Sequence, residues 1–136
     1  MAERSWDARG VVKGVATGRA LISQTALSFL GDLDIRSGRV VGKSSDLCGK
    51  TVSGHVLLLP ETRGSAGAWR FLYQLRVFDT HPAALALREM PDPSVTQGAF
   101  LADIPIVVVS DEGFWAAVGP DDLLCVDGAT GRVSVV

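Results

Sequence analysis

The chain has 136 residues, a formal net charge of -2 and a hydrophobic fraction of 47%. This length fits one domain, and the hydrophobic fraction is high enough to bury a core, which excludes an intrinsically disordered chain. The 13 Lys and Arg residues form no cluster, so we expect neither nucleic acid nor an anionic membrane surface as a partner. We therefore interpret residues 1–136 as a single domain.

The N-terminal residues and the cysteines indicate the cellular location of the chain. The first ten residues, MAERSWDARG, carry charges and lack the apolar segment of a signal peptide. The longest apolar runs, such as Ile104–Val109, are too short to span a bilayer. Cys48 and Cys125 have no second Cys or His at metal-ligand spacing, so we predict reduced thiols, with a disulfide as the alternative. These features predict a cytoplasmic protein that holds no metal or iron–sulfur site by itself.

The first forty residues have the pattern of β structure. Gly10, Gly14 and Gly18 lie among short apolar runs and mark bends or bulges. Residues 28–38 are rich in turn formers and lead into a short predicted strand at Arg39–Val41.

The remainder of the chain alternates apolar strands with helical patterns. Because helices lie between the strands, we expect parallel pairing with right-handed crossovers, and a β layer from the first half covering one face of that sheet. The fold class is therefore α/β, with β/β/α layering. The predicted elements are strands at His55–Leu59, Ala83–Leu87 and Ile104–Val109, helices at about 66–77, Ser94–Ala102 and Asp111–Val118 (with Asp111 as N-cap), and a hairpin of Leu123–Val126 and Arg132–Val136.

The segment Pro60–Ser65, with the sequence PETRGS, combines reactive residues with a suitable position. It follows a predicted buried strand and precedes a predicted helix, at the edge where open α/β sheets bind ligands. Gly64 allows a tight turn and a close substrate approach, and Arg63 can bind a carboxylate through two hydrogen bonds. Ser65 is expected at or near the helix N-cap, where backbone N–H groups and Arg63 favour an alkoxide. The alternative is that Ser65 only caps the helix and Arg63 is a solvated charge.

Other polar residues are weaker candidates. Asp32 and Asp34 could pair as carboxylates beside Ser28, but the glycines around them favour a role in turns. His55 and His81 have no partner at a useful spacing, which favours structural or surface roles.

A series of short motifs runs through the chain from about Gly10 onward. In chain order they are LSFLGDLD at 27–34, SGRVV at 37–41, GHVLLLP at 54–60, RGS at 63–65, HPAAL at 81–85, QGA at 97–99 and IPIVV at 104–108. In this order they resemble the swivel domain of aconitase X, also called the small subunit of that family.

The resemblance implies an aconitase swivel-like β/β/α fold and a large catalytic subunit that holds an iron or iron–sulfur centre, with none bound by this chain alone. It also implies dehydration of a small hydroxy acid at a site shared by the two chains. The serine of the family's R-G-S loop, taken as the catalytic base, corresponds to Ser65, and Arg63 and Gly64 match the same motif. The family usually continues with further serines where this chain has Ala66-Gly67-Ala68, which puts in doubt a role for a second hydroxyl.

The family implies two substrates. We expect cis-3-hydroxy-L-proline, giving Δ1-pyrroline-2-carboxylate, because the composition shows no thermophile bias and only Arg63 offers a cation for a phosphate. Mevalonate 5-phosphate is the alternative, and a non-catalytic interaction module in which Ser65 only caps a helix is a second one. The small subunit of classical aconitase or isopropylmalate isomerase is disfavoured because the G-S-S-R-E run of that family is missing.

Overall fold

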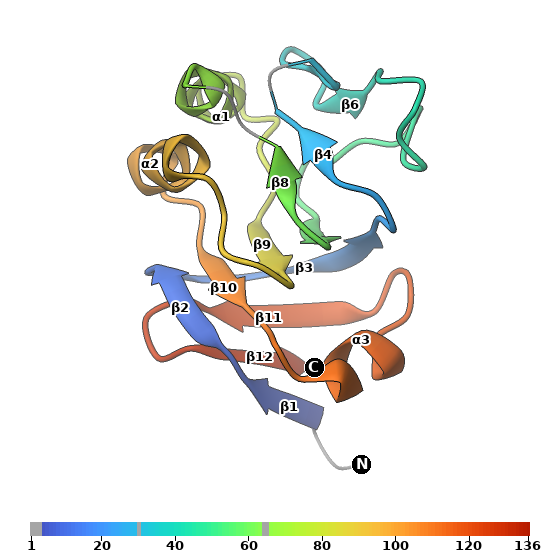
Figure 1. Ribbon diagram of the computed structural model, residues 1–136, viewed down its shortest axis with the longest axis vertical. Coiled ribbons are helices and arrows are strands. Elements are labelled where there is room, and N and C mark those ends of the chain that lie inside the picture. Colours follow the sequence, from blue (N-terminus) through green and yellow to red (C-terminus); the bar gives the residue numbers. More distant parts are fainter. Residues whose placement is uncertain (1–3, 30, 64–65) are drawn as a thin grey trace.

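The computed structural model describes residues 4–29, 31–63 and 66–136. Eight strands form one sheet with the order β1-β12-β11-β3-β7-β9-β10-β2. Two helices, α1 and α2, lie together beside the upper part of this sheet, and α3 lies near its other end (Figure 1). The described elements are β1 (Arg4–Asp7), β2 (Arg9–Val12), β3 (Val15–Ile22), β4 (Leu27–Ser28), β5 (Leu33–Asp34), β6 (Arg39–Val40), β7 (Val56–Leu59), β8 (Thr62–Arg63), α1 (Ala68–Val77), β9 (Ala84–Leu87), α2 (Pro93–Ala102), β10 (Ile106–Val108), α3 (Glu112–Ala117), β11 (Leu123–Asp127) and β12 (Arg132–Val135).

The eight-stranded sheet closes on itself to form a barrel. Its two outermost strands, β1 and β2, are consecutive in the chain and separated only by Ala8. β1 pairs antiparallel with β12 and β2 pairs antiparallel with β10, so one short segment joins both edges of the sheet. The closure requires glycine: a Cβ on Gly10 would lie 2.1 Å from the Gly128 carbonyl oxygen, and a Cβ on Gly128 would lie 2.0 Å from the Val12 carbonyl oxygen. Closure leaves neither edge open for pairing with another chain.

The central strands β7 and β9 are buried on both faces, and successive residues join two different apolar clusters. In β9, Leu85 and Leu87 belong to the cluster that includes the buried residues of α1 and α2. Ala84 and Ala86 belong to the cluster on the other face, inside the barrel. Small side chains at these inner positions suit the narrow interior of a small barrel. The burial predicted from these apolar runs is therefore confirmed.

Most of the predicted elements are present, and β7, β9 and β10 pair in parallel as expected. β3 also pairs in parallel with β7. Asp111 is the N-cap of α3, and its carboxylate accepts a hydrogen bond from the Gly113 N–H at 2.8 Å. The first half of the chain differs from the expectation of a separate covering layer, because β2 and β3 belong to the same sheet as the later strands. β3 is long enough to pair with β11 through its first residues and with β7 through its last ones, which joins the two halves. None of the helices in the described part of the chain is long and apolar enough to cross a membrane.

Above the barrel lies a second region, the loop layer, which we define as residues 24–54 together with β8 (Figure 1). Its strands contain only two residues each: β4 pairs in parallel with β8, and β5 pairs antiparallel with β6. Side chains hold the layer in place. The Asp46 carboxylate, for example, accepts hydrogen bonds from the buried Ser23 hydroxyl at 2.6 Å and from the Gln24 N–H at 2.8 Å.

Candidate functional site

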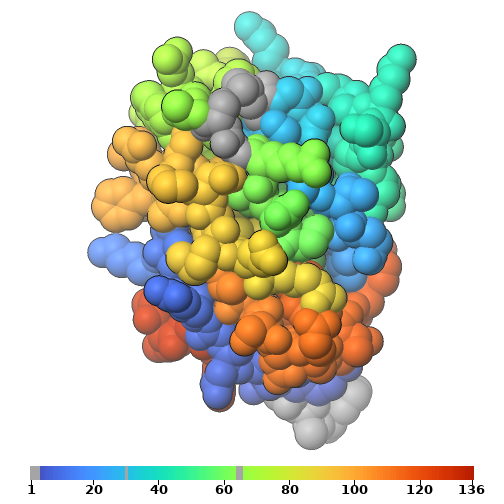
Figure 2. All heavy atoms as spheres, viewed as in Figure 1, coloured from blue at the N-terminus to red at the C-terminus, as the bar shows by residue number. Residues whose placement is uncertain are grey.

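The candidate loop leaves the carboxyl end of β7 through β8. In the β4–β8 pair, Leu27 lies opposite Thr62 and Ser28 lies opposite Arg63. Because side chains alternate along a strand, Thr62 is buried and Arg63 is exposed. The β8 segment, green in Figure 2, lies at the molecular surface between α2 and the blue segment that contains β4. Arg63 is therefore placed after the central buried strand, as predicted, with its guanidinium open to a ligand.

Gly64 and Ser65, the other two predicted site residues, lie outside the described residues. The helix that follows them has Gly67 as its N-cap, two residues after the predicted position, and no side-chain cap hydrogen bond. The physical reason is a contact from another element: the Ser94 hydroxyl, from the first turn of α2, accepts a hydrogen bond from the Trp69 N–H at 3.0 Å. One of the free N–H groups of α1 is therefore satisfied without a capping residue from its own sequence.

Asp92 and Ser94 are neighbours of the candidate loop that the sequence patterns do not reveal. The Thr62 hydroxyl donates a hydrogen bond to Asp92 Oδ2 at 3.1 Å, and the Ser94 hydroxyl donates one to the Ala66 carbonyl oxygen at 3.1 Å. In the sequence, Asp92-Pro93-Ser94 has the appearance of an ordinary helix start, with Pro at the first helical position. The pattern therefore locates the helix but gives no sign that these two side chains bond to another segment.

The carboxylates considered beside Ser28 serve turns. Asp32 Oδ2 accepts a hydrogen bond from the Ser28 N–H at 2.9 Å. Asp34 Oδ2 accepts one from the Ser37 hydroxyl at 2.8 Å, within the β5–β6 turn. The structure therefore gives the two aspartates separate local partners and brings Ser28, on β4, next to Arg63.

The histidines lie away from the candidate loop. His55 Nδ1 is 2.9 Å from the Ser53 carbonyl oxygen, within a turn. His81 lines a cavity of about 530 Å³ with Arg76, Lys13 and Asp103. This cavity is near the start of β9, whereas the R-G-S motif follows the end of β7, which runs parallel to β9. Burial lowers the pKa of His81, the nearby Arg76 guanidinium lowers it further, and Asp79 opposes both effects.

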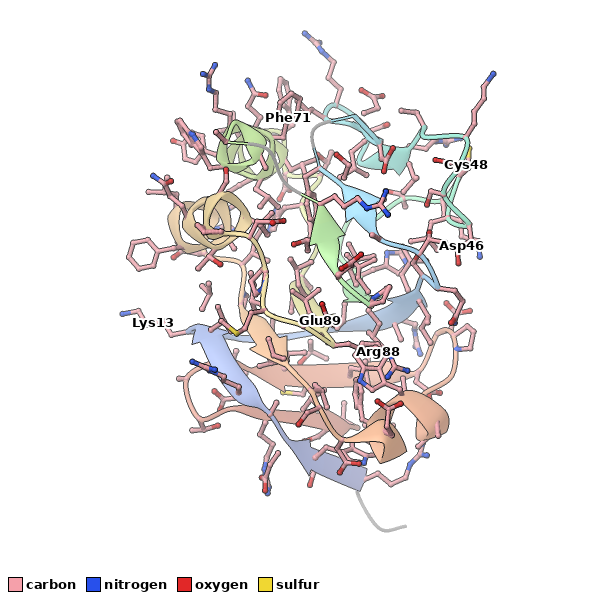
Figure 3. The ribbon with its side chains drawn as sticks, viewed as in Figure 1. Lys13, Asp46, Cys48, Phe71, Arg88 and Glu89 are labelled. Atoms are coloured by element: carbon pink, nitrogen blue, oxygen red, sulfur yellow. The ribbon has the colours of Figure 1, made fainter. Side chains whose placement is uncertain are left out.

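The described residues of this chain do not form a metal centre. Cys48 and Cys125 are free thiols, and Cys48 is exposed in the loop layer close to Asp46 (Figure 3). Across residues 4–29, 31–63 and 66–136, no three His, Cys, Asp or Glu side chains are grouped closely enough to hold a metal ion. An iron or iron–sulfur centre does not fit these residues, since it needs three or more such ligands.

A closed sheet, two helices against its outer face and an exposed loop after the central strand define a swivelling β/β/α domain. The chain belongs to the aconitase X swivel domain family, which matches residues 5–135. Both the predicted fold class and the predicted family are thereby confirmed.

Relatives and solved structures agree with this membership. The phosphomevalonate dehydratase small subunit of Methanosarcina mazei is 34% identical, with 94% of this chain and 88% of the relative covered. The protein of the same name from Methanocella arvoryzae is 36% identical, with 90% and 92% covered. The crystal structure of Thermococcus kodakaraensis aconitase X in its holo-form matches with a TM-score of 0.89 and 29% identity, covering 98% of both chains. A solution NMR structure of a UPF0107 protein matches with the same TM-score and 31% identity, covering 98% of this chain and 99% of that one.

These relatives define the function at a coarse level. The chain is the small subunit of an aconitase X-type dehydratase, a hydro-lyase component that needs a large partner subunit. Of the two substrates considered above, the relatives' names support the alternative, phosphomevalonate, over hydroxyproline.

Proposed function

We propose that this chain is the small subunit of a heteromeric dehydratase of mevalonate 5-phosphate, and that Ser65 is the catalytic base. The observation that supports the substrate is the similarity to phosphomevalonate dehydratase small subunits, at 34% and 36% identity over 90% or more of this chain. The assignment of Ser65 is supported by the R-G-S motif at 63–65, which begins four residues after the end of the central buried strand.

The reaction needs a base at the carbon next to the carboxylate. Mevalonate 5-phosphate carries a hydroxyl group on C3, so the base takes the proton from C2, the electron pair of that bond forms the C2=C3 double bond, and the C3–O bond breaks. The hydroxyl group leaves and is protonated to water. A neutral serine is a weak base, so its site must favour the alkoxide, which cationic and N–H groups do.

Arg63 is the residue of this chain that is best placed to favour negative charge. It is exposed, and it makes no ion pair with any residue in the described part of the chain. Its planar guanidinium matches a carboxylate or a phosphate through paired hydrogen bonds. We assign Arg63 to the substrate's carboxylate, the group beside the proton that is removed.

We assign the iron or iron–sulfur centre that the family implies to the large subunit, because the described residues here do not fit it. In this proposal the present chain contributes one loop to the active site, and the large subunit contributes the pocket that holds the metal. The two free cysteines agree with a cytoplasmic location for the complex, where thiols stay reduced.

The substrate is tested by assaying the purified complex of this chain and its large subunit. Mevalonate 5-phosphate and cis-3-hydroxy-L-proline are supplied separately, and the unsaturated product is measured. We expect turnover of mevalonate 5-phosphate only. Turnover of cis-3-hydroxy-L-proline alone would replace the proposed substrate, and turnover of neither would favour a non-catalytic interaction module.

The base is tested by Ser65→Ala in the same complex. We expect kcat to fall by about 10²–10⁴-fold, the usual contribution of a general base. Ser5→Ala is the matched control, because Ser5 is an exposed serine on β1, at the opposite end of the molecule from α1 and the loop layer. If Ser65→Ala and Ser5→Ala have similar activity, the base lies elsewhere.

A further inference from the structure

Resting on the proposed function, we infer that Asp92 and Ser94, at the start of α2, are positioning residues for the loop that carries Ser65. They bond to the chain on both sides of the R-G-S motif. Neither residue belongs to that motif, and each would act through the backbone of the loop instead of touching the substrate.

The first contact holds the chain before the motif. The buried Thr62 hydroxyl donates to Asp92 Oδ2 at 3.1 Å, and the Asp92 N–H donates back to Thr62 Oγ1 at 3.4 Å. Thr62 is also paired with Leu27 in the short β4–β8 ladder. Thr62, the residue directly before Arg63, is therefore held both by Asp92 and by the pairing of β8 with β4.

The second contact holds the chain after the motif. The Ser94 hydroxyl donates to the Ala66 carbonyl oxygen at 3.1 Å and accepts from the Trp69 N–H at 3.0 Å. The Ser94 hydroxyl thus joins Ala66, the residue directly after the R-G-S motif, to the first turn of α1.

The Asp92 side chain does not have the role that its position at the start of α2 usually gives an aspartate. Asp92 is the N-cap of α2, where an aspartate normally accepts a hydrogen bond from a backbone N–H two or three residues later. Here it makes no such bond, and its carboxylate bonds to Thr62 instead.

The helix that carries these residues has a fixed place against α1. A Cβ on Gly98 of α2 would lie 2.7 Å from the Trp69 Cα, so only glycine allows the two helices to approach this closely. The start of α2 therefore contacts both the end of β8 and the start of α1.

Contacts of this kind affect the chemical step more than binding. A displacement of a base by about 1 Å can lower a rate about 10²-fold, whereas ground-state binding depends on the whole shared pocket. Loss of either side chain should therefore lower kcat and leave KM nearly unchanged.

The experiment uses the complex with the large subunit and compares Ser94→Ala, Thr62→Val and Ser94→Thr with the wild type. We expect Ser94→Ala and Thr62→Val to lower kcat by about 10- to 100-fold, with less than about a twofold change in KM. Ser94→Thr keeps a hydroxyl and should restore most of the rate. Thr96→Ala is the matched control, because the Thr96 hydroxyl donates to the carbonyl oxygen of Asp92, the N-cap of its own helix, and among the described residues it bonds to none on β8 or α1. It should lower the Tm as much as Ser94→Ala and keep kcat.

A double variant separates this inference from the proposed function. If Ser94 acts through Ser65, adding Ser94→Ala to Ser65→Ala should lower kcat no further. Wild-type activity of Ser65→Ala would overturn the proposed function. An inactive Ser65→Ala together with a fully active Ser94→Ala and Thr62→Val would leave that function intact and overturn the positioning role. A loss of rate in Thr96→Ala equal to that in Ser94→Ala would also overturn it, since the effect would then follow helix stability alone.

Discussion

The barrel and the loop layer differ in how regular their backbone is. In the barrel, β3 has eight residues, and alternate residues of the central strands are buried on opposite faces. In the loop layer, every strand has two residues, and the chain is held by carboxylates and hydroxyls that bond to backbone groups. Both regions bury apolar side chains, and Leu27, Phe29 and Val52 of the loop layer are fully buried, but the loop layer also relies on directional hydrogen bonds that fix its turns.

This difference explains where the candidate site lies. A fully buried leucine contributes roughly 1.5–3 kcal/mol, whereas one hydrogen bond contributes only about 1 kcal/mol. The barrel can therefore maintain the fold while individual polar contacts in the loop layer change. Precise placement of a reactive group needs directional contacts, and the candidate loop has such contacts in β8, where Thr62 exchanges two hydrogen bonds with Asp92.

The largest effect should come from opening the barrel. Gly128→Ala places a Cβ 2.0 Å from the Val12 carbonyl oxygen, and only movement of the backbone that closes the sheet can relieve the overlap. We expect the free energy of unfolding to fall by about 3 kcal/mol or more, at the upper end for an overpacked site. Urea unfolding of the wild type and of Gly128→Ala measures this difference in the free energy of unfolding.

Gly31→Ala in the loop layer is the control for this variant. Among the described residues beyond its chain neighbours, no atom lies within 4 Å of a Cβ built at Gly31, so the change should stay within about 0.5 kcal/mol. Equal losses for the two variants would show that the barrel closure is no more constrained than the loops.

The sequence predicts the barrel better than the loop layer, and the reason is the range of the interactions. The apolar runs at Val56–Leu59 and Ala84–Leu87 are local patterns, so their strands, burial and parallel pairing follow from the sequence. Closure of the sheet does not follow, because it depends on contact between Gly10 and Gly128, which are far apart in the chain. The glycine at position 10 is recognisable as a bend, but its partner is not.

The same limit applies to the candidate site. The position of Arg63 after a buried strand follows from the order of apolar and turn residues. The N-cap of α1 and the role of Asp92 do not, because both depend on α2 packing beside the loop. A local sequence pattern predicts the N-cap of a helix only when no side chain from another element accepts a hydrogen bond from the free N–H groups of its first turn.

A smaller effect should come from the loop layer itself. Burial raises the pKa of Asp46, but hydrogen bonds from the Gln24 N–H and the Ser23 hydroxyl outweigh it and hold this pKa below its usual value. Because the folded pKa is lowered, this stabilisation is complete above the unfolded value of 3.8 and is lost as the pH falls through the folded value. Asp46→Asn should lower the free energy of unfolding by about 1 kcal/mol at pH 7, since the carboxylate is exposed and water screens part of its contribution.

Urea unfolding at pH 7 and pH 3 checks this prediction. The difference between wild type and Asp46→Asn should shrink at pH 3. Glu89→Gln, at the exposed carboxylate after β9 (Figure 3), is the control and should change stability less at pH 7. A difference between wild type and Asp46→Asn that stays constant with pH would show that the amide loses packing and not charge-assisted hydrogen bonds.

The smallest effect should come from His81, which lies at the opposite edge of the barrel from the candidate loop. An Arg76 N–H donates to His81 Nε2 at 3.0 Å, so the neutral ring carries its proton on Nδ1, which is buried and has no hydrogen-bond partner among the described residues. Protonating the ring would place a cation beside Arg76, while Asp79 Oδ1, at 3.9 Å from Nδ1, is too exposed to compensate fully. Because burial and Arg76 lower the folded pKa below 6.5, the unfolded chain binds the proton more readily and stability declines as the pH falls below 6.5. His81→Gln should therefore make the urea midpoint depend less on pH between pH 7.5 and pH 5.5. An unchanged pH dependence would show that it comes from groups other than His81.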